Sequence, residues 1–320
     1  MTSHPLDRDM LRHFQEVAAS GEPWSPDWPL SRQRLAWENQ CRRAAARRPA
    51  RLMVEDLEVS GLHVRVYRPP GEDPKPGVLF SHGGGWTMGS CDTHDDICAE
   101  IADEADVVVV MFDYRLAPEH PHPAQVEDAF AVLDWMRSSG RAIGIDPTHI
   151  IGAGDSAGGQ VTAGLALALK AQGLRQLRGM VLIYPALGTD TGTPSYIGHA
   201  QSATLSRDEM IACIAALMGS EDSPNWRDPM AAPNLAEDVA GLPPTFITVA
   251  SHDPIHDDGV IFHGKLAAAG VPAALREEPA LAHSYVRARH SSAACMEGFK
   301  AIAGAVRHLA HEGLLPGQAG

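Results

Sequence analysis

Short apolar runs that alternate with longer segments of helical period constrain the fold of this chain more than any other feature. The apolar runs lie at 57–69, 76–82, 107–114, 149–155, 179–185, 244–253 and 272–279. Between several of them lie segments with helical spacing of apolar residues, at 124–140, 157–173 and 257–270. The run at 57–69 is typical of a hairpin of two strands. The sequence therefore predicts an α/β fold with a mostly parallel eight-stranded sheet, helices on both faces and the hairpin as an antiparallel edge.

Two stretches break this alternation. Residues 1–50 are amphipathic and helical in pattern, and Trp24, Trp28 and Trp37 supply much of their apolar surface. The segment 187–240 is rich in Thr, Ser, Asp and Pro around a helical stretch at 203–219. We expect this insertion to lie over the carboxyl ends of the strands and to pack with the N-terminal helices as a helical cap.

Composition excludes several classes of partner. Hydrophobic residues make up 44% of the chain and charged residues 21%, which is typical of a folded globular protein. The formal net charge is −14 and the basic residues are scattered, so we expect neither nucleic acid nor an anionic membrane as a partner. The apolar stretch at 107–112 is far too short to span a bilayer, and the N-terminal residues lack the features of a signal peptide.

The five cysteines are odd in number and widely spaced, without the paired spacing of a zinc site or the density of a disulfide scaffold. We therefore expect reduced thiols and a cytoplasmic location.

The pattern G-x-S-x-G occurs at 154–158, between a predicted buried strand and a predicted helix. A sharp turn at this point lifts the hydroxyl of Ser156 clear of the sheet, and the flanking glycines provide the room that the turn needs. The motif alone is also compatible with a tight turn that a serine caps. Its context favours a nucleophilic serine.

A glycine-rich segment follows the predicted strand at 76–82. His82 is followed by Gly83, Gly84 and Gly85, whose backbone N–H groups are unobstructed by side chains. Such N–H groups can bind the negative charge that develops on a carbonyl oxygen during acyl transfer. The segment therefore predicts an oxyanion hole.

A nucleophilic serine also needs a base and a carboxylate that orients the base. Asp253 ends the run at 244–253, which brings its carboxylate to the carboxyl edge of the sheet, whereas Asp257 and Asp258 are expected to open the next helix. Once histidines on predicted helices are excluded, His283 and His290 remain. We favour His283 because it closely follows the last predicted strand. The order Ser156, Asp253, His283 is that of the α/β-hydrolase fold.

These motifs together resemble the hormone-sensitive lipase family of carboxylesterases. The resemblance rests on HGGGW at 82–86, DYRLAPEHPHPA at 113–124, GDSAGG at 154–159, DPIHDDG at 253–259 and AHSY at 282–285. It implies an α/β-hydrolase catalytic domain at 51–320 with a cap, and an enzyme that needs no cofactor. It also implies a homodimer by analogy.

The resemblance assigns roles to individual residues. Ser156 corresponds to the nucleophile, His283 to the base and Asp253 to the residue that orients the base. Gly84, Gly85 and the backbone of Ala157 correspond to the oxyanion donors. His82 and Gly83 belong to the same loop, and His82 is expected to brace it.

The second signature of the family, at 113–124, includes Tyr114 and Glu119, which are expected to hold the loop behind the oxyanion hole through buried polar contacts. Two positions depart from the family pattern. Gln160 replaces a frequent Asn, and Ser284-Tyr285 replaces Gly-Phe after the catalytic histidine. The second change is expected to place more bulk beside the base.

Two clusters of histidine and carboxylate residues, at 92–96 and 252–257, have the residue types of metal ligands. The first resembles a family segment that supports the cap, and the second contains the triad aspartate. We therefore expect no metal.

The sequence predicts a serine carboxylesterase that hydrolyses small-molecule esters of short to medium acyl chains through an acyl-enzyme. Two alternatives stay open. An amidase or deacetylase would use the same triad. A non-catalytic receptor for a small molecule, as among plant gibberellin receptors that resemble this family, would lack the catalytic histidine, and His283 argues against it.

Overall fold

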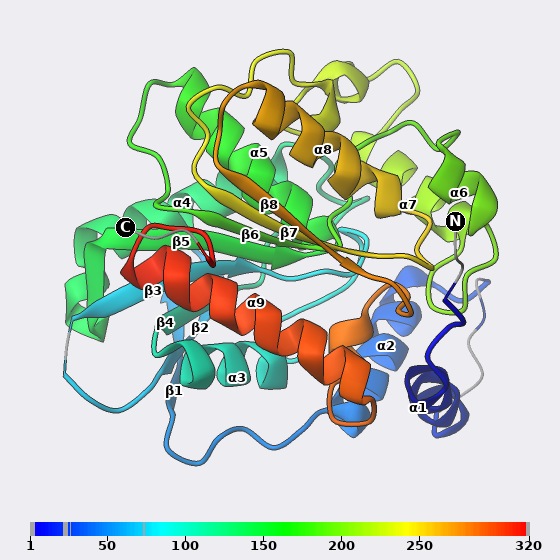
Figure 1. Cartoon of the computed structure of the whole chain (residues 1–320), viewed down its shortest axis with the longest axis horizontal. Helices are drawn as coiled ribbons and strands as arrows, with labels where there is room; N and C mark the ends of the chain where they lie inside the picture. Colours follow the sequence, from blue (N-terminus) through cyan, green and yellow to red (C-terminus); the bar gives the residue numbers. More distant parts are fainter. Residues whose placement is uncertain (1–3, 22–24, 26, 73, 318–320) are drawn as a thin grey trace.

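A computed structural model describes residues 4–21, 25, 27–72 and 74–317 of the chain (Figure 1). In these residues a single eight-stranded sheet has the order β1-β2-β4-β3-β5-β6-β7-β8. The strands are β1 (Met53–Val59), β2 (Leu62–Arg68), β3 (Lys75–Ser81), β4 (Val108–Phe112), β5 (Ile145–Asp155), β6 (Met180–Ile183), β7 (Thr245–Ala250) and β8 (Ala273–Glu278). β1 and β2 are antiparallel to their neighbours, and the other six strands are parallel. The predicted fold and its antiparallel edge are confirmed.

The edge hairpin starts earlier than the sequence pattern suggested. β1 begins at Met53, and the exposed start of this strand carries little of the apolar alternation on which the prediction depended. Ser60 and Gly61 form its turn with φ values of 53° and 80°, the left-handed conformation that matches the twist of two paired strands.

Helices cover both faces of the sheet (Figure 1). α3 (Asp95–Ala105) and α9 (Ala293–His311) lie on one face, while α4 (Ala124–Ser139), α5 (Ala157–Ala171) and α8 (His256–Ala268) lie on the other. The strand β4 shows why both faces are apolar. Val108, Val110 and Phe112 belong to the core under α4 and α5, whereas Val109 and Met111 belong to the core under α3 and α9. This arrangement fixes the parallel strands so that their carboxyl ends meet at one edge.

Further helices gather beyond that edge. They are α1 (Arg8–Ala19), α2 (Leu30–Ala44), α6 (Pro194–Gly198) and α7 (Arg207–Met218). α7 starts four residues later than the helical stretch predicted at 203–219, because Ser206 and Glu209 form a capping box that sets its N-terminus. Trp24, one of the three expected apolar anchors, lies outside the described residues. No helix among the described residues is both long and apolar enough to cross a membrane.

The segment 187–240 is tied to the sheet by a buried carboxylate at the start of α8. Asp258 accepts hydrogen bonds from the backbone N–H groups of Leu187 and Gly188, at 2.8 and 2.9 Å. It is fully buried, and this burial raises the pKa of its carboxyl group from 3.8 to about 7. The role expected for Asp258, a charge that favours the start of a helix, therefore describes only part of what it does.

This contact predicts a pH-dependent stability. Between about pH 4 and 7 the folded chain holds a proton on Asp258 that the unfolded chain has lost, so the free energy of unfolding falls as pH rises through this window. Asp258→Asn removes the titration. We expect the free energy of unfolding of the variant, minus that of the wild type, to increase by on the order of a few kcal/mol between pH 4 and pH 8.

Urea denaturation at several pH values measures this difference. Asp257→Asn is the matched control, because the pKa of the neighbouring Asp257 is not raised but lowered. Parallel stability curves for wild type and Asp258→Asn over this pH range would contradict the prediction.

Candidate active site

Ser156 lies on the turn between β5 and α5, at the carboxyl edge of the sheet. Its φ of 54° and ψ of −120° are unusual for a residue other than glycine, so the surrounding contacts must hold the turn in place. The N–H of Ser156 donates to the carbonyl of Ile183 at 2.9 Å. A side chain on Gly158 would collide with the carbonyl of Ser81, which explains the glycine at this position. The turn directs the hydroxyl of Ser156 toward His283.

His283 and Asp253 complete a chain of hydrogen bonds with this serine. Nε2 of His283 lies 2.9 Å from Oγ of Ser156, and Nδ1 lies 2.7 Å from Oδ2 of Asp253. The other carboxylate oxygen of Asp253 accepts the N–H of Ile255 at 3.0 Å. All three side chains are buried, Asp253 completely. Asp253 follows β7 and His283 follows β8, so neighbouring strands bring together residues that are far apart in the sequence.

The glycine-rich loop after β3 lies beside Ser156. The N–H of Gly83 donates to Oδ1 of Asp155 at 2.8 Å, which joins the loop to the residue before Ser156. Gly84 has a φ of 124°, and a side chain there would collide with the carbonyl of Met88. In the described part of the chain no protein acceptor contacts the N–H of Gly84 or Gly85. Ala157 is the first residue of α5, so the helix provides no acceptor for its N–H.

His82 lies behind this loop rather than at the serine. Its ring stacks on Tyr114 at 4.1 Å between centroids, and its Nδ1 lies 2.9 Å from the carbonyl of Gly83. Burial lowers the pKa of His82 to about 4, so the ring is neutral near pH 7. Tyr114 donates to the carbonyl of His82 at 2.8 Å, as expected of a buried polar contact. The same expectation is wrong for Glu119, which is exposed and bonds Arg34 of α2 instead.

A network that the sequence did not reveal lies next to the loop. Nε2 of His94 is 2.9 Å from the NH2 nitrogen of Arg287 and 3.3 Å from a carboxylate oxygen of Asp155. His94 and Arg287 are 193 residues apart, so no local pattern could connect them. His94 belongs to the cluster at 92–96, whose sequence gave no sign of this contact.

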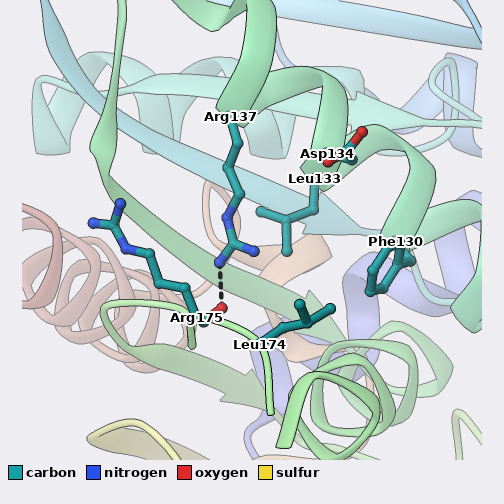
Figure 2. Close-up of a pocket in the computed structure, with 6 residues that line it drawn as sticks. All are labelled: Phe130, Leu133, Asp134, Arg137, Leu174 and Arg175. Carbon is teal, nitrogen blue, oxygen red and sulfur yellow. Dashed lines mark hydrogen bonds between the residues drawn. The ribbon is translucent and has the colours of Figure 1, made fainter. Parts of the chain in front are cut away.

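A large cavity opens onto Ser156 and His283. Its volume is about 1030 Å³, and residues of α1, α2 and α7 form much of its wall together with Gly84, Gly85 and Arg287. A second cavity of about 160 Å³ lies between α4 and the loop after α5, away from the serine (Figure 2). Phe130, Leu133, Asp134, Arg137, Leu174 and Arg175 line it. Figure 2 shows Arg137 donating to the carbonyl of Arg175, and this smaller cavity contains no nucleophile.

The two departures from the family pattern have different consequences. Gln160 accepts the indole N–H of Trp86 at 2.7 Å and donates to the carbonyl of Met230, so it joins the glycine-rich loop to the segment 187–240. Ser284 lines the large cavity. Tyr285 is completely buried, and its hydroxyl contacts Thr248 of β7. Tyr285 therefore does not add the bulk that was expected beside the base, because its side chain points into the core.

The acidic residues in the cluster at 92–96 bind basic side chains. Asp92 and Asp95 contact Arg65, and Asp96 contacts Arg289. In the described ranges one other group, His63, Cys91 and Asp113, has ligand atoms within 4.8 Å of one another. The carboxylate of Asp113 already contacts the N–H of Cys91 and the ring of His63. These contacts account for the arrangement of the three residues.

Known proteins are similar to this chain in fold and in sequence. A family model described as the alpha/beta hydrolase fold matches residues 78–287. The chain therefore belongs to the α/β-hydrolase family, in the hormone-sensitive lipase-like group of carboxylesterases.

Particular relatives extend over most of the chain. This chain is 41% identical over 242 residues to Esterase LipI of Mycobacterium tuberculosis, with 73% of this chain and 75% of the relative aligned. It is 40% identical over 230 residues to Carboxylesterase NlhH of the same species, with 71% and 72% aligned. Its structure is similar to that of the Pyrobaculum calidifontis esterase, with a TM-score of 0.85, 30% identity and coverage of 96% and 99%.

Proposed function

We propose that this protein is a serine carboxylesterase that hydrolyses esters of short to medium acyl chains through an acyl-enzyme intermediate. The observation that carries the proposal is the continuous hydrogen-bonded chain from Ser156 through His283 to Asp253. It lies at the wall of the large cavity, beside backbone N–H groups for which the described residues provide no acceptor. The relatives, which are themselves named esterases, support the same activity.

The direction of proton transfer follows from the hydrogen bonds. Asp253 accepts a hydrogen bond from the Nδ1–H of His283, so the lone pair on Nε2 faces the hydroxyl of Ser156. His283 takes the hydroxyl proton as Oγ of Ser156 bonds to the ester carbonyl carbon. His283 then gives this proton to the departing alcohol as the ester C–O bond breaks. A water molecule next attacks the acyl-enzyme as its proton passes to His283. The acid is released when the bond to Oγ of Ser156 breaks and His283 returns the proton to that oxygen.

The oxyanion donors that we propose are the N–H groups of Gly84, Gly85 and Ala157. Each attack converts the carbonyl oxygen into an oxyanion, and donors that are already in place stabilise it without reorganisation. The contact between Gly83 and Asp155 supports this role, since it fixes the loop relative to Ser156. We assign His82 a bracing role for the same loop, as its stacking on Tyr114 suggests.

We further propose that residues 1–50 and 187–240 form a cap over the catalytic domain 51–320. Arg34 of α2 supports this, because it donates to the carbonyls of Thr87 and Ala117 at 2.7 and 3.0 Å. A Cβ on Gly84 would lie only 3.3 Å from the ring of Trp37, so α2 lies directly against the glycine-rich loop. A cytoplasmic location fits the five cysteines, all of which are free.

A panel of aryl esters from acetate to palmitate tests the function. We expect turnover that survives prolonged treatment with EDTA, since the N–H groups supply the stabilisation that a metal would otherwise give. The acyl-chain length at which kcat/KM collapses measures the room that the capped cavity leaves for the acyl chain. Trp37→Ala should increase this length. Matched anilides on the same panel separate an amidase from an esterase. No turnover of any ester would contradict the proposal.

A further inference from the structure

We propose that Arg287 forms an anion-binding subsite in the large cavity and that the preferred substrates are esters that carry a carboxylate. This inference rests on the proposed function and adds a substrate class to it. It concerns a side chain that belongs neither to the triad nor to the oxyanion donors.

Arg287 is close to the reacting groups in both sequence and space. It lies in a short 3-10 helix, Tyr285–Ala288, on the loop that carries His283. The cavity that Ser156 and His283 line is also lined by Arg287. Its guanidinium lies 5.1 Å from the ring of Trp37, and that ring contacts Gly84 of the glycine-rich loop. A small molecule with its ester at Ser156 can therefore reach Arg287 with a short second arm.

The protein partners of Arg287 are all neutral. NH1 donates to the carbonyl of Thr93 at 3.0 Å and to the sulfur of Cys41 at 3.4 Å, and NH2 donates to His94 at 2.9 Å. Among the residues that the structure describes, no carboxylate oxygen lies within 4.0 Å of this guanidinium. No acceptor in the same residues contacts its Nε–H. Arg287 therefore has a charge without a direct ion pair and at least one donor to spare.

His94 accepts from Arg287 because of its own neighbours. The hydroxyl of Thr93 donates to the carbonyl of Ser90, so its oxygen is an acceptor for the proton on Nδ1 of His94. Nε2 of His94 then accepts from Arg287, and the carboxylate of Asp155 lies 3.3 Å from the same nitrogen. Burial lowers the pKa of His94, so the ring is neutral and does not repel Arg287.

The other charged groups in the cavity wall already have hydrogen-bond partners in the protein. Arg289 binds Glu100 through two nitrogens and Asp96 through one. Asp96 also accepts the N–H of Ala46, and Asp155 accepts the N–H of Gly83. The carboxylate of Glu209 accepts from the backbone and hydroxyl of Ser206. Arg287 is thus the group in this wall that gains most from a ligand carboxylate, with which a guanidinium forms strong charge-assisted hydrogen bonds.

Two pairs of substrates test the subsite on either side of the ester. Ethyl hydrogen succinate carries a carboxylate on its acyl part, and ethyl levulinate replaces that carboxylate with a methyl ketone of similar size. The acetate ester of β-hydroxypropionate carries the carboxylate on its alcohol part, and the acetate ester of the matching methyl ketone is its neutral partner. We expect kcat/KM to favour the anion by about tenfold or more in one pair, which also identifies the side of the ester that faces Arg287.

Arg287→Gln should bring the ratio of kcat/KM between the anionic ester and its neutral partner close to one, while Arg287→Lys should keep part of the preference. Because the readout is a ratio within one variant, a general loss of turnover does not affect it. High salt should lower the ratio in wild type as well. Equal or lower kcat/KM for both anions in wild type, with the neutral esters hydrolysed, would overturn the subsite and leave the proposed function intact.

Failure of the proposed function gives a different result, in which none of the four esters is hydrolysed. Calorimetry of ethyl hydrogen succinate with Ser156→Ala then decides the subsite without any turnover. Binding that weakens by about tenfold in the double variant with Arg287→Gln supports it, and unchanged or absent binding overturns it.

Discussion

Ser156→Ala should lower kcat by a factor on the order of 10⁶, which is the loss found when the nucleophile of another serine hydrolase is removed. The fold should survive, because the backbone bonds that hold the turn involve the N–H and carbonyl of residue 156 and not its hydroxyl. Among the described side chains, the hydroxyl forms a hydrogen bond with His283 alone. Alanine keeps the small size that the turn requires.

Steady-state kinetics and a thermal melt of the same preparation measure this prediction. An organophosphate should label Ser156 in the wild type, and peptide mass spectrometry should find no label in the variant. Ser284→Gly is the matched control, since Ser284 also lines the cavity and its φ of 61° suits glycine. Label on a different residue, or turnover by Ser156→Ala near that of wild type, would refute the assignment.

The centre of the sheet could be predicted because its strands are buried on both faces. β4 is apolar at all five positions and three of them are valine, which is typical of a parallel strand covered on both faces. The cap was harder to delimit, since its helices depend on local capping and on distant contacts. Ser206 and Glu209 set the start of α7, and Arg34 holds α2 to loops more than 50 residues away.

In the candidate site too, some residues could be predicted from the sequence and others could not. Ser156, Asp253 and His283 could be proposed because each must follow a strand for the chemistry to work, and strands can be read from apolar runs. Arg287 could not be proposed, because its neighbours His94, Cys41 and Trp37 come from two helical regions far away in the sequence. Tyr285 was misjudged for a related reason. Whether its side chain faces the cavity or the core depends on the backbone of Ser284, which no residue pattern specifies.

Asp253→Asn should lower kcat by about 10⁴, the loss that the analogous change causes in the serine-protease template. The structure explains why the amide would take the harmful orientation. Oδ1 of Asp253 accepts the N–H of Ile255, which holds the amide oxygen on that side and turns the NH2 group toward Nδ1 of His283. Nδ1 must then accept, so the proton moves to Nε2, where the imidazole can no longer take a proton from Ser156.

Asp257→Asn is the informative comparison, because the two carboxylates are four residues apart and both lie near the start of α8. Asp257 contacts the N–H of Ser195 and the ring of His256, and neither contact involves His283. An asparagine oxygen can still accept from Ser195, so turnover should stay close to that of wild type. The kinetics of the two variants on one aryl ester measure the difference. A crippling loss from Asp257→Asn with near-normal turnover by Asp253→Asn would mean that Asp257, and not Asp253, orients His283, since only the acid partner of the base controls its tautomer.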